Sequence, residues 1–130
     1  MKYEFASDLQ LIAEKISNLM FPHIKLPQVK CFRSFGTSSR GTIARCHTIG
    51  KLMQKAIGVK PHYALEFLSE RFDKLSEEEQ TKVVIHELMH IPKTFGGGFK
   101  HHNFVTETAV NKMFKEAKNE RVEEKQKRWF

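Results

Sequence analysis

The sequence predicts an α+β fold, with a small, mostly antiparallel sheet of three to four strands packed on one histidine-bearing helix. Apolar residues recur at helical spacing near both ends of the chain, while the segments between them alternate as strands do. The predicted order is one helix, three strands and two helices, so N- and C-terminal helices flank the sheet. We expect one domain over residues 1–130, because 130 residues with 40% hydrophobic side chains supply a single core.

The first predicted helix covers residues 8–20. Ser7 and Gln10 have the spacing of an N-terminal capping box, and Pro22 ends the run. The apolar residues that follow at helical spacing are Leu9, Ile12, Ile16 and Leu19.

Three strands are predicted next. The first places Val29, Cys31 and Phe35 on one side, and the glycine-containing segment 36–41 after it predicts a loop. A second strand covers residues 42–49, although its pattern does not distinguish an inward face. A short helical turn closed by Gly58 precedes the third strand, whose alternating pattern puts Tyr63, Leu65 and Phe67 inward.

A short helix is predicted from about Glu77. Ser76 and Glu79 form a second capping box, and three consecutive glutamates suit the positive end of a helix dipole. A buried stripe is expected at Val84, Leu88 and Ile91, and Pro92 prevents much continuation.

The run Gly96–Gly98 allows segment 93–102 to bend back toward this helix. Asn103 is the predicted cap of a last helix with an apolar stripe at Val110, Met113, Phe114 and Ala117. The highly charged tail 118–130 is expected to be a frayed, solvated helix end.

The segment 86–90 spells H-E-x-x-H within the predicted helix. His86 and His90, four residues apart, would stand on one helix face, where both imidazoles reach a single Zn²⁺ at about 2.0–2.1 Å. Glu87 would lie beside the metal as the general base that activates a metal-bound water. The pattern predicts zinc-dependent hydrolysis, although Co²⁺ and Ni²⁺ also accept this ligand set.

Catalytic zinc usually takes three protein ligands, so two histidines leave one to be found. His102, twelve positions after His90, is the first choice; His101 is its rival, and Glu107 would give a two-His-one-Glu set. The remaining histidine, or Asn103, could donate a hydrogen bond to the oxyanion. No comparable spacing involves His23, His47 or His62, which are expected to be structural or surface residues.

The stretch from His86 to Gly98 resembles the small metallopeptidases of archaea and phages, which look related to the SprT-like and WLM peptidases. The resemblance rests on H-E-L-x-H-I-P-K followed by glycines and a histidine, and it extends over residues 27–115. It implies a zincin-type fold and peptide hydrolysis, with zinc held by His86, His90 and His102 and with Glu87 as the base. The cysteine-rich zinc ribbon of many SprT-like proteins is missing, so DNA-linked substrates do not follow by analogy.

The net charge of +7 is unevenly distributed. No acidic residue lies between Glu14 and Glu66, so the region 15–60 is strongly basic and could attract nucleic acid or an acidic partner. The basic residues of this interval are Lys15, Lys25, Lys30, Arg33, Arg40, Arg45, Lys51, Lys55 and Lys60. A basic binding module with a structural zinc site is therefore the alternative to a peptidase.

Other metal enzymes fit less well. Deformylases need a cysteine ligand that lies within a motif of its own, and neither Cys31 nor Cys46 lies in such a motif. Both cysteines are expected to be ordinary buried thiols. Metal-dependent endoribonucleases with three close histidines lack a base equivalent to Glu87. No signal peptide and no apolar run of about 20 residues is present, so we expect a cytoplasmic protein without a membrane span. Its oligomeric state is open.

Overall fold

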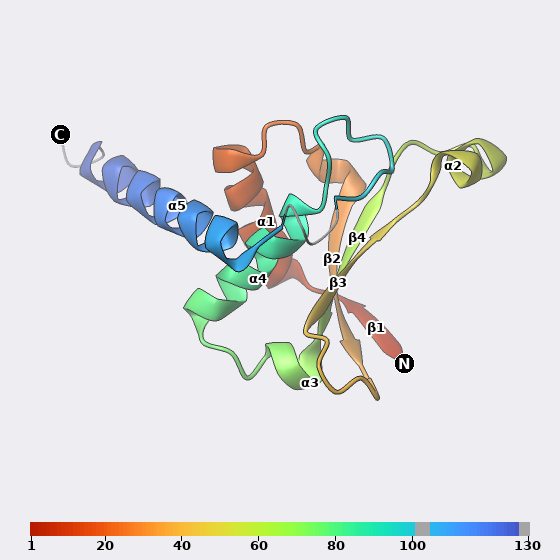
Figure 1. The fold of residues 1–130 in the computed structure, drawn as a ribbon, viewed down its shortest axis with the longest axis horizontal. Helices are drawn as coiled ribbons and strands as arrows, with labels where there is room; N and C mark the ends of the chain where they lie inside the picture. Colours follow the sequence, from red (N-terminus) through yellow and green to blue (C-terminus); the bar gives the residue numbers. More distant parts are fainter. Residues whose placement is uncertain (101–104, 128–130) are drawn as a thin grey trace.

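The computed structural model describes residues 1–100 and 105–127 and confirms the α+β class (Figure 1). Its elements in chain order are β1 (Lys2–Phe5), α1 (Ser7–Met20), a 3₁₀ turn (Leu26–Gln28), β2 (Val29–Phe35), β3 (Ala44–Thr48), α2 (Lys51–Ile57), β4 (Tyr63–Leu68), α3 (Ser69–Phe72), α4 (Glu77–Met89) and α5 (Glu107–Lys127). In the described part of the chain, no helix is both long and apolar enough to cross a membrane.

The four strands form one mixed sheet in the order β1-β2-β4-β3. The outer pairs, β1 with β2 and β3 with β4, are antiparallel, whereas the central pair of β2 and β4 is parallel. Strand β1 was not expected, because its four residues are all exposed and show no inward-facing pattern. It is a strand because it pairs with residues 32–35 of β2, which lie far from it in the sequence.

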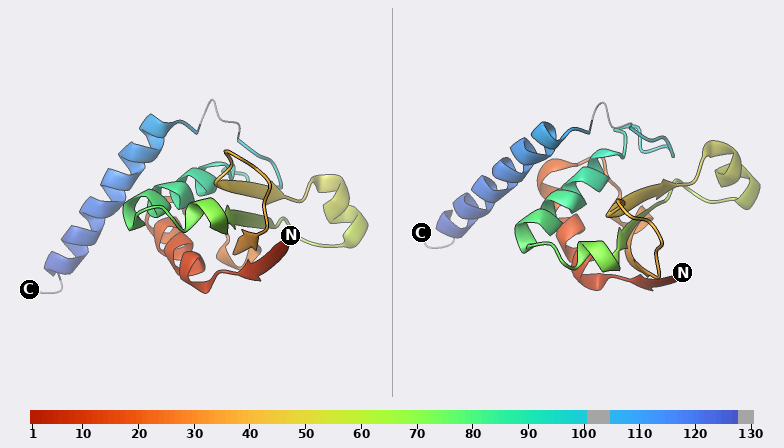
Figure 2. Two further views of the ribbon diagram at one scale, coloured as in Figure 1. Left: turned by 90° about the horizontal axis from the view of Figure 1, so that it is seen from below. Right: turned by 60° about the horizontal axis from the view of Figure 1, so that its bottom comes forward.

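Helices α1, α4 and α5 gather on one side of the sheet, and α2 projects away beyond the end of β3 (Figures 1 and 2). The sheet face beneath these helices carries the inward set expected for β4, and Tyr63, Leu65 and Phe67 are all at most 2% exposed. Leu9 and Ile16 from α1 and Leu88 from α4 complete the same core. Burial of these side chains holds the helices on the sheet.

Gln10 has a different role from the one expected. Helix α1 has Ala6 at its N-cap with no side-chain cap, so the predicted capping box of Ser7 and Gln10 is wrong. Gln10 is buried, and its amide donates to the Val29 carbonyl at 2.8 Å while its carbonyl accepts from the Cys31 N–H at 2.8 Å. Strand β1 pairs only with residues 32–35 of β2, and the Gln10 side chain satisfies the β2 backbone that β1 does not reach.

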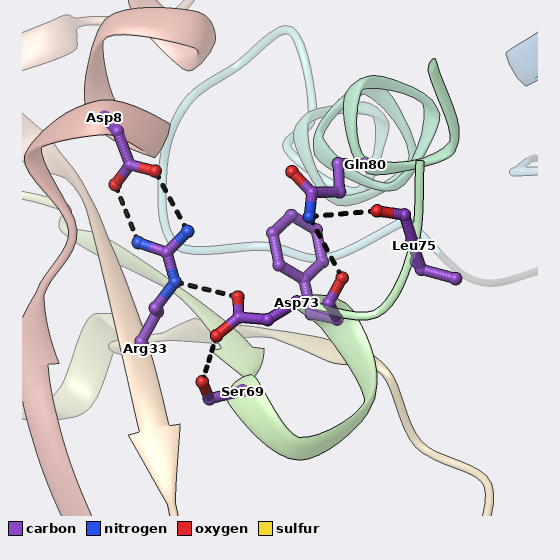
Figure 3. Close-up of polar contacts among 7 residues, drawn as sticks. Asp8, Arg33, Ser69, Asp73, Leu75 and Gln80 are labelled. Carbon is purple, nitrogen blue, oxygen red and sulfur yellow. Dashed lines mark hydrogen bonds and ion pairs between the residues drawn. The ribbon is translucent and has the colours of Figure 1, made fainter. Parts of the chain in front are cut away.

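Arg33 connects three elements on the helix side of β2 (Figure 3). Its guanidinium donates two hydrogen bonds to Asp8 of α1, at 2.7 and 2.9 Å, and one to Asp73 after α3, at 3.0 Å. The hydrogen bond from Arg33 lowers the pKa of the Asp8 carboxyl below its usual value. Asp73 also accepts from the Ser69 hydroxyl. This basic residue of the 15–60 interval is thus engaged within the fold and does not project toward a partner.

Helix α4 begins where the sequence predicts. Ser76 Oγ accepts the Glu79 N–H at 3.2 Å, and Gln80 donates to the carbonyls of Phe72 and Leu75, which ties the first turn to the preceding loop (Figure 3). Helix α5 begins at Glu107 with Thr106 Oγ1 accepting the Ala109 N–H, whereas Asn103, the expected cap, lies outside the described residues. Gly58 ends α2 in the left-handed conformation that was expected of it.

The role of Gln10 can be tested by the nearly isosteric change Gln10→Leu. It should lower the free energy of unfolding by about 3 kcal/mol, because a buried N–H and a buried C=O of β2 would both lose their partner. Urea unfolding measures this loss. Gln28→Leu is the control, since the Gln28 side chain donates a single hydrogen bond, to the Pro61 carbonyl, and its loss should cost about 1 kcal/mol. Equal losses in the two variants would contradict the assigned role.

Candidate metal centre

The last turns of α4 bring two imidazoles and one carboxylate together. The ligand atoms of His86, Glu87 and His90 all lie within 4.8 Å of one another. The rings of His86 and His90 have their centroids 5.0 Å apart at 71°, as expected for two residues one turn apart on one helix face. Val84, Ile85 and Leu88 are fully buried on the other faces of the helix. Core packing therefore fixes the rotation of α4 and the direction of both imidazoles.

Glu87 is 5% exposed, unlike the solvated glutamates at the start of α4. Burial raises the pKa of its carboxyl to about 7, because low-polarity surroundings disfavour the charged form. A cation beside it would favour the carboxylate. The side chain thus stands where a proton can be taken up or released near neutral pH, as general acid–base chemistry requires.

His90 is held from two directions. Its Nδ1 donates to the Lys100 carbonyl, and the Lys100 N–H donates to the His90 carbonyl at 2.8 Å. Since a carbonyl only accepts, Nδ1 carries the hydrogen, and in the neutral imidazole this leaves Nε2 as the unprotonated nitrogen that a metal ion requires. The Phe99 ring stacks on the imidazole at 4.4 Å between centroids and 9° between planes. Both contacts fix the ring orientation.

The turn that brings Lys100 back to His90 depends on the glycine run. The Tyr63 hydroxyl donates to the Gly98 carbonyl at 2.9 Å and accepts the Gly97 N–H at 3.1 Å. The Gly97 carbonyl accepts from Thr48 Oγ1, and the Gly96 carbonyl accepts from the Gln54 amide. The loop is therefore fastened to β4, β3 and α2, and the expected return of segment 93–102 is confirmed as far as Lys100.

Gly97 itself cannot be replaced easily. Its φ is +98°, and a Cβ atom there would lie 2.4 Å from Gln54 Nε2 and 2.5 Å from the Ile49 carbonyl oxygen. The Ile49 oxygen belongs to the backbone and cannot move aside without shifting the end of β3. Phe95, at the start of the loop, also has a positive φ of 47°, and its buried ring packs on Tyr63.

The predicted third ligands have different outcomes. His102 and His101 lie outside the described residues, so their positions in the site stay predictions. Glu107 is exposed as the first residue of α5 and does not belong to the cluster of ligand atoms. Lys100, the residue immediately before His101, lies against His90.

Among the described residues, His23, His47 and His62 do not belong to this cluster, in line with their expected structural or surface roles. His23 shares a hydrogen bond with the Ile91 carbonyl, His47 with Glu66, and His62 with the Lys60 carbonyl. Both cysteines are free thiols. Burial raises the pKa of Cys46 to about 12, with the nearby charge of Glu87 adding to it, so this thiol stays protonated and is a poor metal ligand.

Several residues that shape the site were not identified from the sequence. Phe99 and the Lys100 carbonyl act on His90, and Gln54, Thr48 and Tyr63 hold the loop. Tyr63 gave one usable signal, because a tyrosine at an inward strand position must find a partner for its hydroxyl. A backbone carbonyl and a glutamine on an exposed helix give no signal in a sequence.

Gly97→Ala should disrupt the metal site from a distance. We expect a loss of stability of about 1–3 kcal/mol and weaker zinc binding by about tenfold, because the loop must shift away from His90. Gly41→Ala is the matched control, since a Cβ at Gly41 would meet nothing within 4 Å. Calorimetric titration with Zn²⁺ and thermal unfolding measure both effects. Wild-type zinc affinity in Gly97→Ala would disprove the link between loop and ligand.

Comparison with known proteins agrees with this geometry. The family model described as "Putative phage metallopeptidase" matches residues 1–125. No curated protein and no solved structure matches the chain. The matched region contains the whole sheet, the helix α4 and its cluster of His86, Glu87 and His90. The chain therefore belongs to the phage metallopeptidase family.

Proposed function

We propose that this protein hydrolyses peptide bonds with a divalent metal ion, of which Zn²⁺ is the best candidate. The proposal rests on one observation above all, namely that two imidazoles and a buried carboxylate converge within 4.8 Å on α4. Membership in a metallopeptidase family supports the same reaction class. Imidazole nitrogen donors suit zinc better than calcium or magnesium.

We assign His86 and His90 as two of the metal ligands and His102 as the third, with His101 as the rival. The position of Lys100 supports this assignment, because its backbone is hydrogen-bonded at both its N–H and its carbonyl to His90. The described chain thus returns to His90 one residue before His101 and two before His102. Glu107 is the weaker choice because it is exposed at the start of α5.

A divalent ion in this site would polarise the substrate carbonyl and lower the pKa of a water molecule. The role assigned to Glu87 is that of the base, which would accept a proton from water and would later deliver it to the nitrogen of the departing amine. The burial of Glu87 excludes competing solvent from its carboxylate. His90 keeps its orientation through the Lys100 carbonyl and the Phe99 ring during both steps.

The substrate chain would bind along β3. This strand lies at the edge of the sheet beside β4, and its side toward α4 brings Cys46 close to Glu87. Extended peptides commonly add to such an open edge, where backbone hydrogen bonds provide affinity with little sequence preference. A peptide paired with β3 would run past the end of α4 that carries His86 and Glu87.

Glu87→Gln should retain bound zinc and lose peptidase activity by about 10²–10⁴-fold, because the amide cannot accept the proton from water. Glu78→Gln on the same helix is the matched control, since its side chain is 56% exposed. Zinc content by mass spectrometry and cleavage of an unfolded protein substrate are measured together. Wild-type turnover by Glu87→Gln would refute the assignment of the base.

The third ligand is tested by comparing His102→Ala with His101→Ala. We expect His102→Ala to lose most of its zinc after gel filtration, because two ligands bind zinc weakly. His101→Ala should keep a stoichiometry near that of the wild type. The reverse pattern would assign the ligand to His101, and full zinc content in both variants would rule out both histidines.

A further inference from the structure

The sheet face opposite the helices has its own chemical character. The register places Phe5, Phe32, Glu66 and Arg45 in one row across all four strands, and Lys30, Ala64 and His47 in the next. No helix among the described residues covers this face, and α2 projects beyond one end of it (Figures 1 and 2). We call this set of residues, together with Tyr3, the outer face.

Aromatic side chains dominate the β1 and β2 half of the outer face. Tyr3 is 60% and Phe5 is 50% exposed, although both belong to a strand. The Phe5 ring meets Phe32 edge to face at 5.9 Å between centroids. Neighbouring aromatic rings that are exposed on a protein surface commonly mark a binding site.

Two adjoining depressions lie on this face. One, of about 360 Å³, is lined by Tyr3, Phe32, His47, Ala64 and Glu66. The second, of about 470 Å³, shares Phe32, His47 and Ala64 with it and continues past Lys30 toward Ile57 and Val59. Together they form a shallow, aromatic-lined track across the strands.

The charge of the outer face is positive. Lys30 and Arg45 project from it as cations beside the His47 imidazole, and its acidic residue, Glu66, is 4% exposed. His47 lies 2.7 Å and Arg45 3.6 Å from Glu66 Oε1. Burial disfavours the carboxylate of Glu66, but Ser34, His47 and Arg45 outweigh this effect and lower its pKa. The charge of this carboxylate is therefore offset by the Arg45 guanidinium, and Lys30 adds a further cation to the face.

This face explains part of the basic interval in the sequence. Lys30 and Arg45 come from the segment without acidic residues, whereas Arg33, between them in sequence, points to the helix side and binds Asp8 and Asp73. Because successive side chains of a strand point to opposite faces, Arg33 forms ion pairs on the helix side while Lys30 and Arg45 lie on the outer face.

We propose that the outer face binds single-stranded nucleic acid. Exposed rings on a sheet offer stacking platforms for unpaired bases, and flanking cations bind the phosphates between them. The preference for single strands follows from this chemistry, because a duplex hides the faces of its bases. The site is separate from the metal centre, which lies on the helix side, and would hold the enzyme on nucleic acid while proteins are cleaved.

Binding is measured by fluorescence anisotropy with a labelled oligo-dT of about 12 nucleotides and with the matching duplex. We expect single-strand affinity that falls steeply between about 50 and 200 mM salt, and weaker duplex binding. The double variant Tyr3→Ala/Phe5→Ala should bind at least tenfold more weakly. Leu11→Ala, on α1 and 59% exposed, should bind like the wild type.

Two variants with the same change in net charge distinguish binding at the outer face from general electrostatic attraction to the protein. Lys30→Glu should weaken binding about threefold and reduce the salt slope by about one, whereas Lys74→Glu, exposed before α4 with the same change in net charge, should do neither. Equal effects in these two variants, unchanged affinity after loss of both aromatics, or no oligonucleotide binding would each overturn the proposal. Self-association through this face with no oligonucleotide binding would overturn it as well. Glu87→Gln should bind the oligonucleotide like the wild type. The nucleic-acid proposal is therefore tested independently of the peptidase assignment.

Discussion

The link between His90 and Lys100 is the constraint on which the site depends. It joins the end of α4 to a loop that is fastened to β4, β3 and α2, so the proposed metal ligand His90 is held by elements from most of the chain. The histidines alone would give a helix face with two flexible rings. The Lys100 carbonyl selects the tautomer of His90, and Phe99 restricts its ring to one plane.

The sheet keeps the residues near the candidate metal centre apart from those of the outer face, because successive side chains of each strand point to opposite faces. On β3, Cys46 faces the core near Glu87 while Arg45 and His47 project from the opposite side. On β2, Cys31 and Arg33 face the helices while Lys30 and Phe32 face outward. A protein of 130 residues can therefore carry a candidate metal centre and a separate basic, aromatic surface on one sheet without the two competing for residues.

Buried and half-buried polar side chains link the helices to strand β2. Gln10 extends the hydrogen bonding of β2 where β1 stops, and Arg33 draws α1 and the α3 turn onto the same strand. These contacts also position the first turn of α4 through the loop that carries Asp73 and Leu75. The start of α4, whose last turns carry His86 and His90, is thus tied to β2 through this loop.

By itself, the sequence determined the elements with strong local signals. The capped start of α4, the end of α2 at Gly58, the inward face of β4 and the placement of His86, Glu87 and His90 all follow from spacing and from the preferences of single residues. Only the tertiary structure decided the parallel pairing of β2 with β4, the existence of β1, the use of Gln10 as a strand partner and the support of His90 by a backbone carbonyl. These depend on contacts between residues far apart in the chain, and a backbone carbonyl or an exposed strand leaves no mark in the pattern of side chains.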